Sequence, residues 1–253
     1  MTKFCIITVA AKDNSGIRGT VASVDQQTVA PYRHILVVSQ VPTCELESLP
    51  SRPYREIIRD QDRSLYNAMN IGLERASGDL VLFLNGGDLL YRKNSLEVVS
   101  RKWDGASIVS GRSVQIFGEH IYLRPRIGHL SDLLFSSPHQ AFYTPLSSEL
   151  PRYDETGRIG ADSVWMDQVR KLHSQQLLSD VLCRFSLGGL SNSPTLKTVR
   201  RRWRFDGTRA AAKEAAKLLL HRSLGQSTAY RILYSKRFAH CRMRPSRRQH
   251  LAH

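Results

Sequence analysis

The chain has 253 residues, 41% of them hydrophobic, which is enough to bury one sizeable α/β core. No run approaches the roughly 18 consecutive apolar residues of a membrane span, and the apolar opening lacks the charged start and cleavage site of a secretion signal. The net charge of +15 is uneven: residues 1–196 carry 21 Lys and Arg against 20 Asp and Glu, whereas residues 197–253 carry 16 against 2. This distribution excludes a uniformly basic nucleic-acid-binding protein and favours a neutral enzyme body with a basic attachment segment.

Apolar runs that alternate with helical patterns predict an α/β fold. A helix is expected over Gly16–Gln27, where apolar residues recur at helical spacing. The order of strands and helices predicts a mostly parallel, doubly wound sheet. The expected strands are Phe4–Val9, His34–Val38, Leu80–Leu84 and Ser107–Ser110.

The clearest expected helix spans Ser64–Ser77. Ser64 can cap its N-terminus, and Gly78 follows where a glycine commonly ends a helix. Apolar residues form a stripe along it, whereas Tyr66 and Asn67 fall off that stripe. The helix leads directly into a fully apolar strand that ends in a polar loop.

That loop, Asn85-Gly86-Gly87-Asp88, is the first candidate for chemistry. In open α/β sheets, ligands bind outside the carboxyl ends of the strands. Asp88 can hold a divalent cation, because hard cations take carboxylate oxygens, and the two glycines allow close approach of a ligand. The alternative is that the segment is only a turn, since Asn, Gly and Asp are common turn residues.

Other polar residues each carry a functional and a structural interpretation. Asp162 can deprotonate a hydroxyl as a general base, or it can cap the helix that follows. His139 can touch phosphate or acceptor, or it can be a packed imidazole. Asp62 can cap the helix after it, and Arg63 can bind phosphate or remain a solvated charge. Tyr66 is expected to pack rather than to take part in catalysis.

In order along the chain, these segments resemble the family-2 glycosyltransferases of the GT-A fold. The resemblance covers about residues 3–192, and it extends to enzymes of colanic acid biosynthesis whose strand-end loop is similar to N-S-G-D. Asp62–Gly72 resembles the family pattern D-x-G-I-Y-D-A-M-N-x-G. The matching segments that follow are Ala76–Asp79, Phe83–Asp88, Ser137–Gln140, Ala161-Asp162 and Phe185–Ser191.

This resemblance implies a nucleotide-sugar enzyme with Mg²⁺ or Mn²⁺. Asp88 would bind the metal and the diphosphate, and Asp162 would be the general base of an inverting displacement. The segment Thr8–Lys12 would form part of the nucleotide pocket. Residues implied to contact the nucleotide sugar are Thr8, Ala10, Asp62, Arg63, Asn70, Asn85 and His139.

Two positions depart from the family pattern. The second strand of the family usually ends in an Asp that reads the base, but here it continues into Ser39–Pro42 without one. Asn67 stands where the family usually has Asp. The first departure leaves the identity of the nucleotide open, and the second either weakens a hydrogen bond of the site or is tolerated.

The basic segment 197–253 is expected to be helical over Arg209–Arg222 and disordered from Arg242. Its cations interleave with aromatic and aliphatic residues, notably in Arg200–Phe205. This composition suits a helix lying on an anionic membrane surface. The alternatives are a solvated helix packed on the body and a surface that binds RNA or DNA phosphates.

Together these observations predict a GT-A catalytic domain over residues 1–196 and a basic helical tail over 197–253. The expected function is transfer of a sugar from a nucleoside-diphosphate sugar to a polysaccharide or lipid-linked oligosaccharide. Four scattered cysteines without a C-x-x-C pair favour a reducing cytoplasm, so we expect a cytoplasmic protein held at the inner face of the cell membrane. The alternatives are a non-catalytic sugar-nucleotide or polysaccharide-binding relative and a nucleic-acid-binding protein.

Overall fold

The structure is a computed structural model, and it describes residues 1–11, 16–61, 64–117, 120–125, 129–156, 160–187 and 194–238. Asp62, Arg63 and Lys12, which the resemblance places at the nucleotide sugar, lie outside these ranges. The segment from Arg242, expected to be disordered, also lies outside them.

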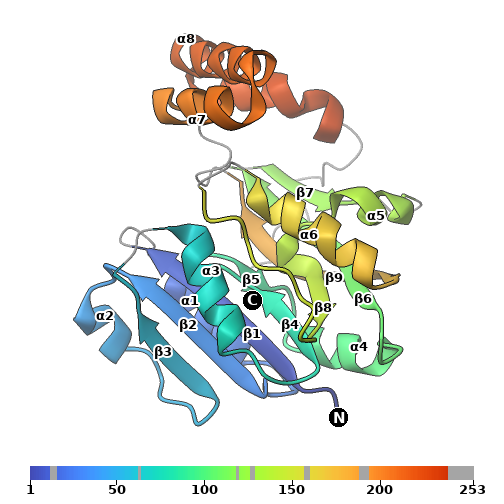
Figure 1. The fold of residues 1–253 in the computed structure, drawn as a ribbon. Helices are drawn as coiled ribbons and strands as arrows, with labels where there is room; N and C mark the ends of the chain where they lie inside the picture. The colour runs from blue at the N-terminus through green and yellow to red at the C-terminus, as the bar shows by residue number, and fades with distance from the viewer. Residues whose placement is uncertain are drawn as a thin grey trace.

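The strands of the described residues form one curved sheet in the order β3-β2-β1-β4-β8-β6-β9-β5, with β7 paired to β6. The four strands on the β3 side are parallel, as expected. Beyond β4 the sheet is mixed: β8 runs antiparallel to β4 and β6, whereas β9 is parallel to β6. The α/β class is thus confirmed (Figure 1). The strands are β1 (Phe4–Ala11), β2 (Arg33–Ser39), β3 (Arg55–Arg59), β4 (Leu80–Phe83), β5 (Leu89–Leu90), β6 (Ile108–Phe117), β7 (His120–Arg124), β8 (Phe142–Pro145) and β9 (Gln175–Ser186).

Helices cover both faces of this sheet because successive side chains of a strand point to opposite sides. Ile7 of β1 shares a buried cluster with helices α3 (Leu65–Glu74) and α6 (Ala161–Leu172). Ile6, its neighbour, shares another with α1 (Ile17–Asp25) and α4 (Ser95–Lys102). A third cluster lies under the short helix α2 (Thr43–Glu47).

The segment between β7 and β8 contains three short helical pieces. These are η1 (Leu130–Asp132), α5 (Leu133–Ser136) and the 3-10 turn η2 (His139–Ala141). Ser137 donates from its hydroxyl to the carbonyl of Leu133, and Gln175 of β9 donates to the same carbonyl at 3.0 Å. The segment is therefore tied to the sheet immediately before His139.

Two helices, α7 (Leu196–Asp206) and α8 (Thr208–Phe238), follow the sheet and lie together at one end of the molecule (Figure 1). Thr195 caps α7 in a capping box with Thr198. Gly207, with φ of +83°, separates the two helices, and Gly225 interrupts α8. No helix among the described ranges is long and apolar enough to cross a membrane.

Candidate active site

The loop that follows β4 is held in place by helix α1. The Thr20 hydroxyl accepts a hydrogen bond from the backbone N–H of Gly87 at 2.9 Å and donates to the Asp88 carbonyl at 2.8 Å. Gly87 has a φ of +94°, a conformation that favours glycine. The loop is therefore a turn, and α1 fixes where its acidic residue lies.

Asp88 is 9% exposed, and its Oδ2 accepts a hydrogen bond from Gln140 Nε2 at 2.9 Å. Burial raises the pKa of this carboxyl to about 6, although the charge of His139 and the hydrogen bond from Gln140 act in the opposite direction. A cation beside the carboxylate would lower that pKa, because it would stabilise the ionised form.

Asp162 lies in the first turn of α6. Gly160, with φ of +85°, occupies the N-cap position, so Asp162 is not itself the N-cap. Its Oδ2 lies 3.5 Å from Nδ1 of His139, and 28% of its side chain is exposed. Burial acts to raise the pKa of Asp162, but the contact and charge of His139 and the Ser163 backbone N–H lower it below its usual value. Asp162 is therefore ionised and accessible from solvent.

The 3-10 turn η2 connects the two carboxylates. His139 faces Asp162 through Nδ1, and its Nε2 lies 3.3 Å from the amide nitrogen of Asn85. The adjacent Gln140 binds Asp88. Burial opposes protonation of His139, but Asp162 and then Asp88 raise its pKa above the usual value. The structure thus brings Asn85, Asp88, His139 and Asp162 into one cluster.

Three other residues expected to contact the nucleotide sugar, Thr8, Ala10 and Asn70, make contacts elsewhere in the fold. The Thr8 side chain is fully buried and its hydroxyl lies 3.0 Å from Nε2 of His34, while Ala10 is buried in the core. Asn70 uses its amide to bond the backbone N–H and carbonyl of Tyr153 and the carboxylate of Glu155. The structure therefore does not bring the polar groups of Thr8 or Asn70 into the cluster.

Two residues of the site were not singled out from the sequence. Gln140 belongs to the Ser137–Gln140 motif, and its position next to His139 could have indicated that it belongs to the site. Thr20 has no such signal, since it binds a loop 67 residues further along the chain.

The donor atoms of the cluster suit a divalent cation that shares its coordination with a substrate. Among the described residues, no group of three or more His, Cys, Asp or Glu side chains is close enough to hold a metal ion. Asp88 nevertheless offers a carboxylate, and the buried Oδ1 of Asn85 has no hydrogen-bond partner within the described ranges. These oxygens fit Mg²⁺ or Mn²⁺, which keep other positions for water and substrate phosphate.

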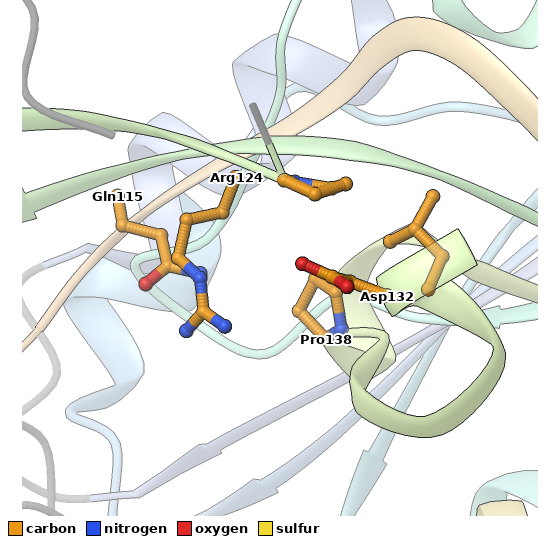
Figure 2. Close-up of a pocket in the computed structure, with 6 residues that line it drawn as sticks. Gln115, Arg124, Asp132 and Pro138 are labelled. Carbon is orange, nitrogen blue, oxygen red and sulfur yellow. The ribbon is translucent and has the colours of Figure 1, made fainter. Parts of the chain in front are cut away.

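Two cavities in the described part of the chain lie outside this cluster. One, of about 10 Å³, has room for roughly one water molecule and includes Pro138, next to His139. Figure 2 shows Arg124 and Asp132 approaching this space from different elements. The other, of about 300 Å³, lies between α4 and β9. Neither is lined by Asp88 or Asp162, so we define the candidate site by the side-chain contacts.

Similarity to solved structures identifies the fold of the chain. No family model and no curated protein sequence matches the chain. The structure of S. aureus TarS matches with a TM-score of 0.60 and 14% identity over 90% of this chain; the chain spans 45% of TarS. TarS 1-349 in complex with UDP-GlcNAc matches with a TM-score of 0.64 and 14% identity, over 91% of this chain and 75% of that one.

A third match is the mannosyltransferase PcManGT from Pyrobaculum calidifontis in complex with GDP-Man and Mn²⁺. Its TM-score is 0.54 at 14% identity, over 93% of this chain and 79% of the mannosyltransferase. At this identity the likeness concerns the fold alone. The chain therefore has the α/β fold of glycosyltransferase structures, which confirms the expected GT-A architecture.

Proposed function

We propose that the chain is a family-2 glycosyltransferase that moves a sugar from a nucleoside-diphosphate sugar to a glycan or lipid-linked saccharide, as in bacterial exopolysaccharide synthesis. The observation that carries the proposal is the cluster in which the His139–Gln140 turn joins Asp88 to Asp162. Two proteins of the same fold have UDP-GlcNAc or GDP-Man bound, which supports this class of donor.

Each carboxylate has a distinct part in the proposed reaction. Asp88 and the Asn85 amide oxygen would hold Mg²⁺ or Mn²⁺, which neutralises charge on a diphosphate leaving group. Asp162, ionised beside His139, accepts the proton of the acceptor hydroxyl. The acceptor oxygen then bonds to the anomeric carbon as the bond from that carbon to the diphosphate breaks, which inverts the anomeric centre.

The test is sugar transfer by the purified protein with UDP-, GDP-, CMP- and dTDP-sugars and Mn²⁺. Asp162→Asn and Asp88→Asn should each abolish most turnover, because loss of a general base alone lowers rates by about 10²–10⁴-fold. Asp167→Asn is the matched control, since Asp167 lies on the same helix with 67% of its side chain exposed. Full activity in both site variants would refute these roles.

A second candidate is a non-catalytic protein that binds sugar nucleotides or polysaccharides. The observation in its favour is that β2 ends at Ser39 without the base-reading Asp of the family. Tight binding of a nucleotide sugar without turnover, across a panel of glycan and lipid-linked acceptors, would favour this candidate over the enzyme.

We also propose that the catalytic domain over residues 1–196 is held from the cytoplasm at the inner face of the cell membrane by the tail. Helices α7 and α8 expose apolar side chains, including Trp203 and Leu219, each 65% exposed. The tail's two acidic residues, Asp206 and Glu214, are largely shielded and pair with Arg202 and Lys217. Its exposed charged side chains on α7 and the start of α8 are therefore cationic, and each near anionic lipid contributes about 1 kcal/mol.

Sedimentation with lipid vesicles tests this attachment. The full chain should bind vesicles that contain anionic lipid, bind neutral vesicles weakly, and lose binding as salt increases. Trp203→Ser should weaken binding to the anionic vesicles. Equal binding to neutral and anionic vesicles would contradict the proposal, and retention on RNA or DNA in place of vesicles would favour the nucleic-acid alternative.

A further inference from the structure

Gln140 binds the carboxylate that the proposed function assigns to the metal. Its side-chain amide donates from Nε2 to Oδ2 of Asp88 over 2.9 Å. Both residues are buried, Gln140 with 7% and Asp88 with 9% of its surface exposed. An ionised carboxylate only accepts hydrogen bonds and an amide nitrogen only donates them, so the contact has a fixed direction. Bonds of this kind are shorter and stronger than those between neutral groups.

The backbones of both residues are held in place. The Thr20 hydroxyl donates to the Asp88 carbonyl at 2.8 Å. On the other side, the N–H of Ala141 donates to the carbonyl of Pro138 at 3.0 Å, which closes the turn η2 around Gln140. Strand β8 begins immediately after this turn and pairs with β4, the strand that leads to the Asp88 loop. The tertiary structure therefore sets the distance between the two side chains.

The hydrogen bond restricts how the carboxylate of Asp88 can turn. The terminal torsion of an aspartate is broad, so an unrestrained carboxylate can rotate to present either oxygen or both. Here Oδ2 accepts from Gln140, and the amide group lies beside it. A cation that bound both oxygens would compete with this hydrogen bond, whereas a cation bound through Oδ1 leaves it intact. Coordination through one oxygen is therefore favoured.

Divalent cations differ in how many carboxylate oxygens they accept. Mg²⁺ requires a near-octahedral set of ligands at about 2.0–2.1 Å and commonly takes one or two carboxylates together with water and phosphate. Mn²⁺ also takes octahedral sets of oxygen ligands. Ca²⁺ takes about 6–8 oxygens in flexible geometry, to which a carboxylate can contribute both of its own. A single fixed oxygen from Asp88 thus suits the smaller cations, and loss of that restraint would favour Ca²⁺.

We infer that Gln140 is a positioning residue for Asp88: its amide restricts the carboxylate to coordination through Oδ1, so that the site selects Mg²⁺ or Mn²⁺ over Ca²⁺. The inference rests on the proposed function, since it takes Asp88 as the metal ligand, and it adds which ion the site prefers and why. Groups that hydrogen-bond a metal ligand change metal affinity by about 10–100-fold when they are removed.

The test measures metal affinity without measuring sugar transfer. Melting temperatures of the full chain are recorded against the concentration of Mn²⁺ or Ca²⁺, in one series with saturating UDP and in another with GDP. The metal-dependent rise gives an apparent Kd for each ion. The wild type should bind Mn²⁺ more tightly than Ca²⁺. Gln140→Met keeps the length of the side chain and loses the donor, so Kd for Mn²⁺ should rise about 10–100-fold and Kd for Ca²⁺ about threefold or less.

Two further variants separate a role at the metal from a general effect on the fold. Gln140→Glu keeps the size of the side chain but places a second carboxylate beside Asp88, so it should shift the preference toward Ca²⁺ further than Gln140→Met does. Gln115→Met is the matched control. Gln115 is also a buried glutamine, 5% exposed, and it donates to the Ser113 hydroxyl, outside the cluster of Asp88. This control should keep the wild-type ratio of the two Kd values.

The outcomes separate this inference from the proposed function. If the wild type prefers Mn²⁺ and Gln140→Met keeps the same ratio of Kd values, Gln140 does not select the ion and the proposed function stands. Equal affinity of the wild type for the two ions, or an equal change of the ratio in Gln115→Met, would also overturn the inference. If neither ion raises the melting temperature of the wild type with either nucleotide, the metal role of Asp88 in the proposed function fails, and the inference fails with it.

Discussion

Asp88→Asn should make the protein more stable near neutral pH while it removes activity. The pKa of the Asp88 carboxyl rises from 3.8 to about 6 on folding. A rise of about two pKa units corresponds to about 3 kcal/mol, since each unit is worth about 1.4 kcal/mol. The folded state holds this proton more tightly than the unfolded state, so the ionised carboxylate lowers the free energy of unfolding as pH rises from about 4 to 6.

The gain in the free energy of unfolding of Asp88→Asn over the wild type should therefore depend on pH. Above pH 6 the variant avoids the full penalty of about 3 kcal/mol, or roughly 6–12 °C in melting temperature, and at pH 5 about half of it. Urea denaturation of both proteins at pH 5 and pH 8, without divalent metal, measures this difference. A gain that is equal at the two pH values, or a loss at pH 8, would refute the reasoning.

Bound metal should make the wild type at least as stable as Asp88→Asn, which reverses the order expected without metal. A ligand that binds only the folded protein adds about 2.7 kcal/mol at a concentration 100 times its dissociation constant. Mn²⁺ with nucleoside diphosphate should therefore stabilise the wild type, whose carboxylate is ionised, and have little effect on Asp88→Asn. An equal increase in melting temperature in both proteins would place the metal elsewhere.

Four further changes test the neighbours of the site and the core. His139→Gln removes the imidazole that lowers the pKa of Asp162, so burial should raise that pKa and move the acid limb of the kcat/KM profile to higher pH; an unmoved limb would contradict this. Thr20→Val removes the hydroxyl that holds the Asn85–Asp88 loop. Calorimetry should show that Mn²⁺-dependent binding of the donor is weakened about tenfold. Unchanged affinity would show that the Thr20 hydroxyl is not needed to place the loop. Gly72→Ala places a Cβ 2.4 Å from an isoleucine methyl of β1 and should lower the free energy of unfolding by about 1–3 kcal/mol, measured in urea. Gly19→Ala, whose Cβ meets its nearest neighbour at 3.4 Å, should be neutral or stabilising by up to about 1 kcal/mol.

The elements with strong local patterns could be predicted from the sequence. The helix expected over Ser64–Ser77 is α3 (Leu65–Glu74), and Ser64 caps it by accepting from the N–H of Asn67. The apolar run Phe4–Val9 is the core of β1. Here propensity, hydrophobic periodicity and capping agree, so local information was sufficient.

Elements whose pattern depends on their neighbours were missed. Strand β3 (Arg55–Arg59) is half polar because it lies at the sheet edge, where Arg55 pairs with Asp25 and Arg59 donates to the Thr43 hydroxyl. Strand β9 (Gln175–Ser186) mixes buried and exposed residues irregularly along its length. Neither shows the continuous apolar run by which buried strands are recognised.

The candidate site shows the same division. Asp88 and Asp162 stand out because the first follows a strand and the second begins a helix, and His139 stands out through the Ser137–Gln140 resemblance. Their partners depend on contacts distant in sequence: Gln140 binds a carboxylate 52 residues earlier, and the Thr20 hydroxyl binds the backbone of a loop 67 residues later. No local pattern encodes such pairs, so they required the tertiary structure.

The position of α7 and α8 at one end of the molecule has an electrical consequence. Residues 1–196 are nearly balanced in charge, whereas residues 197–238, which form nearly all of α7 and α8, carry 12 Lys and Arg against 2 Asp and Glu, so the protein has a pronounced permanent dipole. Near a negatively charged surface, that dipole experiences a torque before any contact forms. The protein would therefore approach the surface with its helical end first. Both the association rate and the degree of orientation would decrease as ionic strength increases.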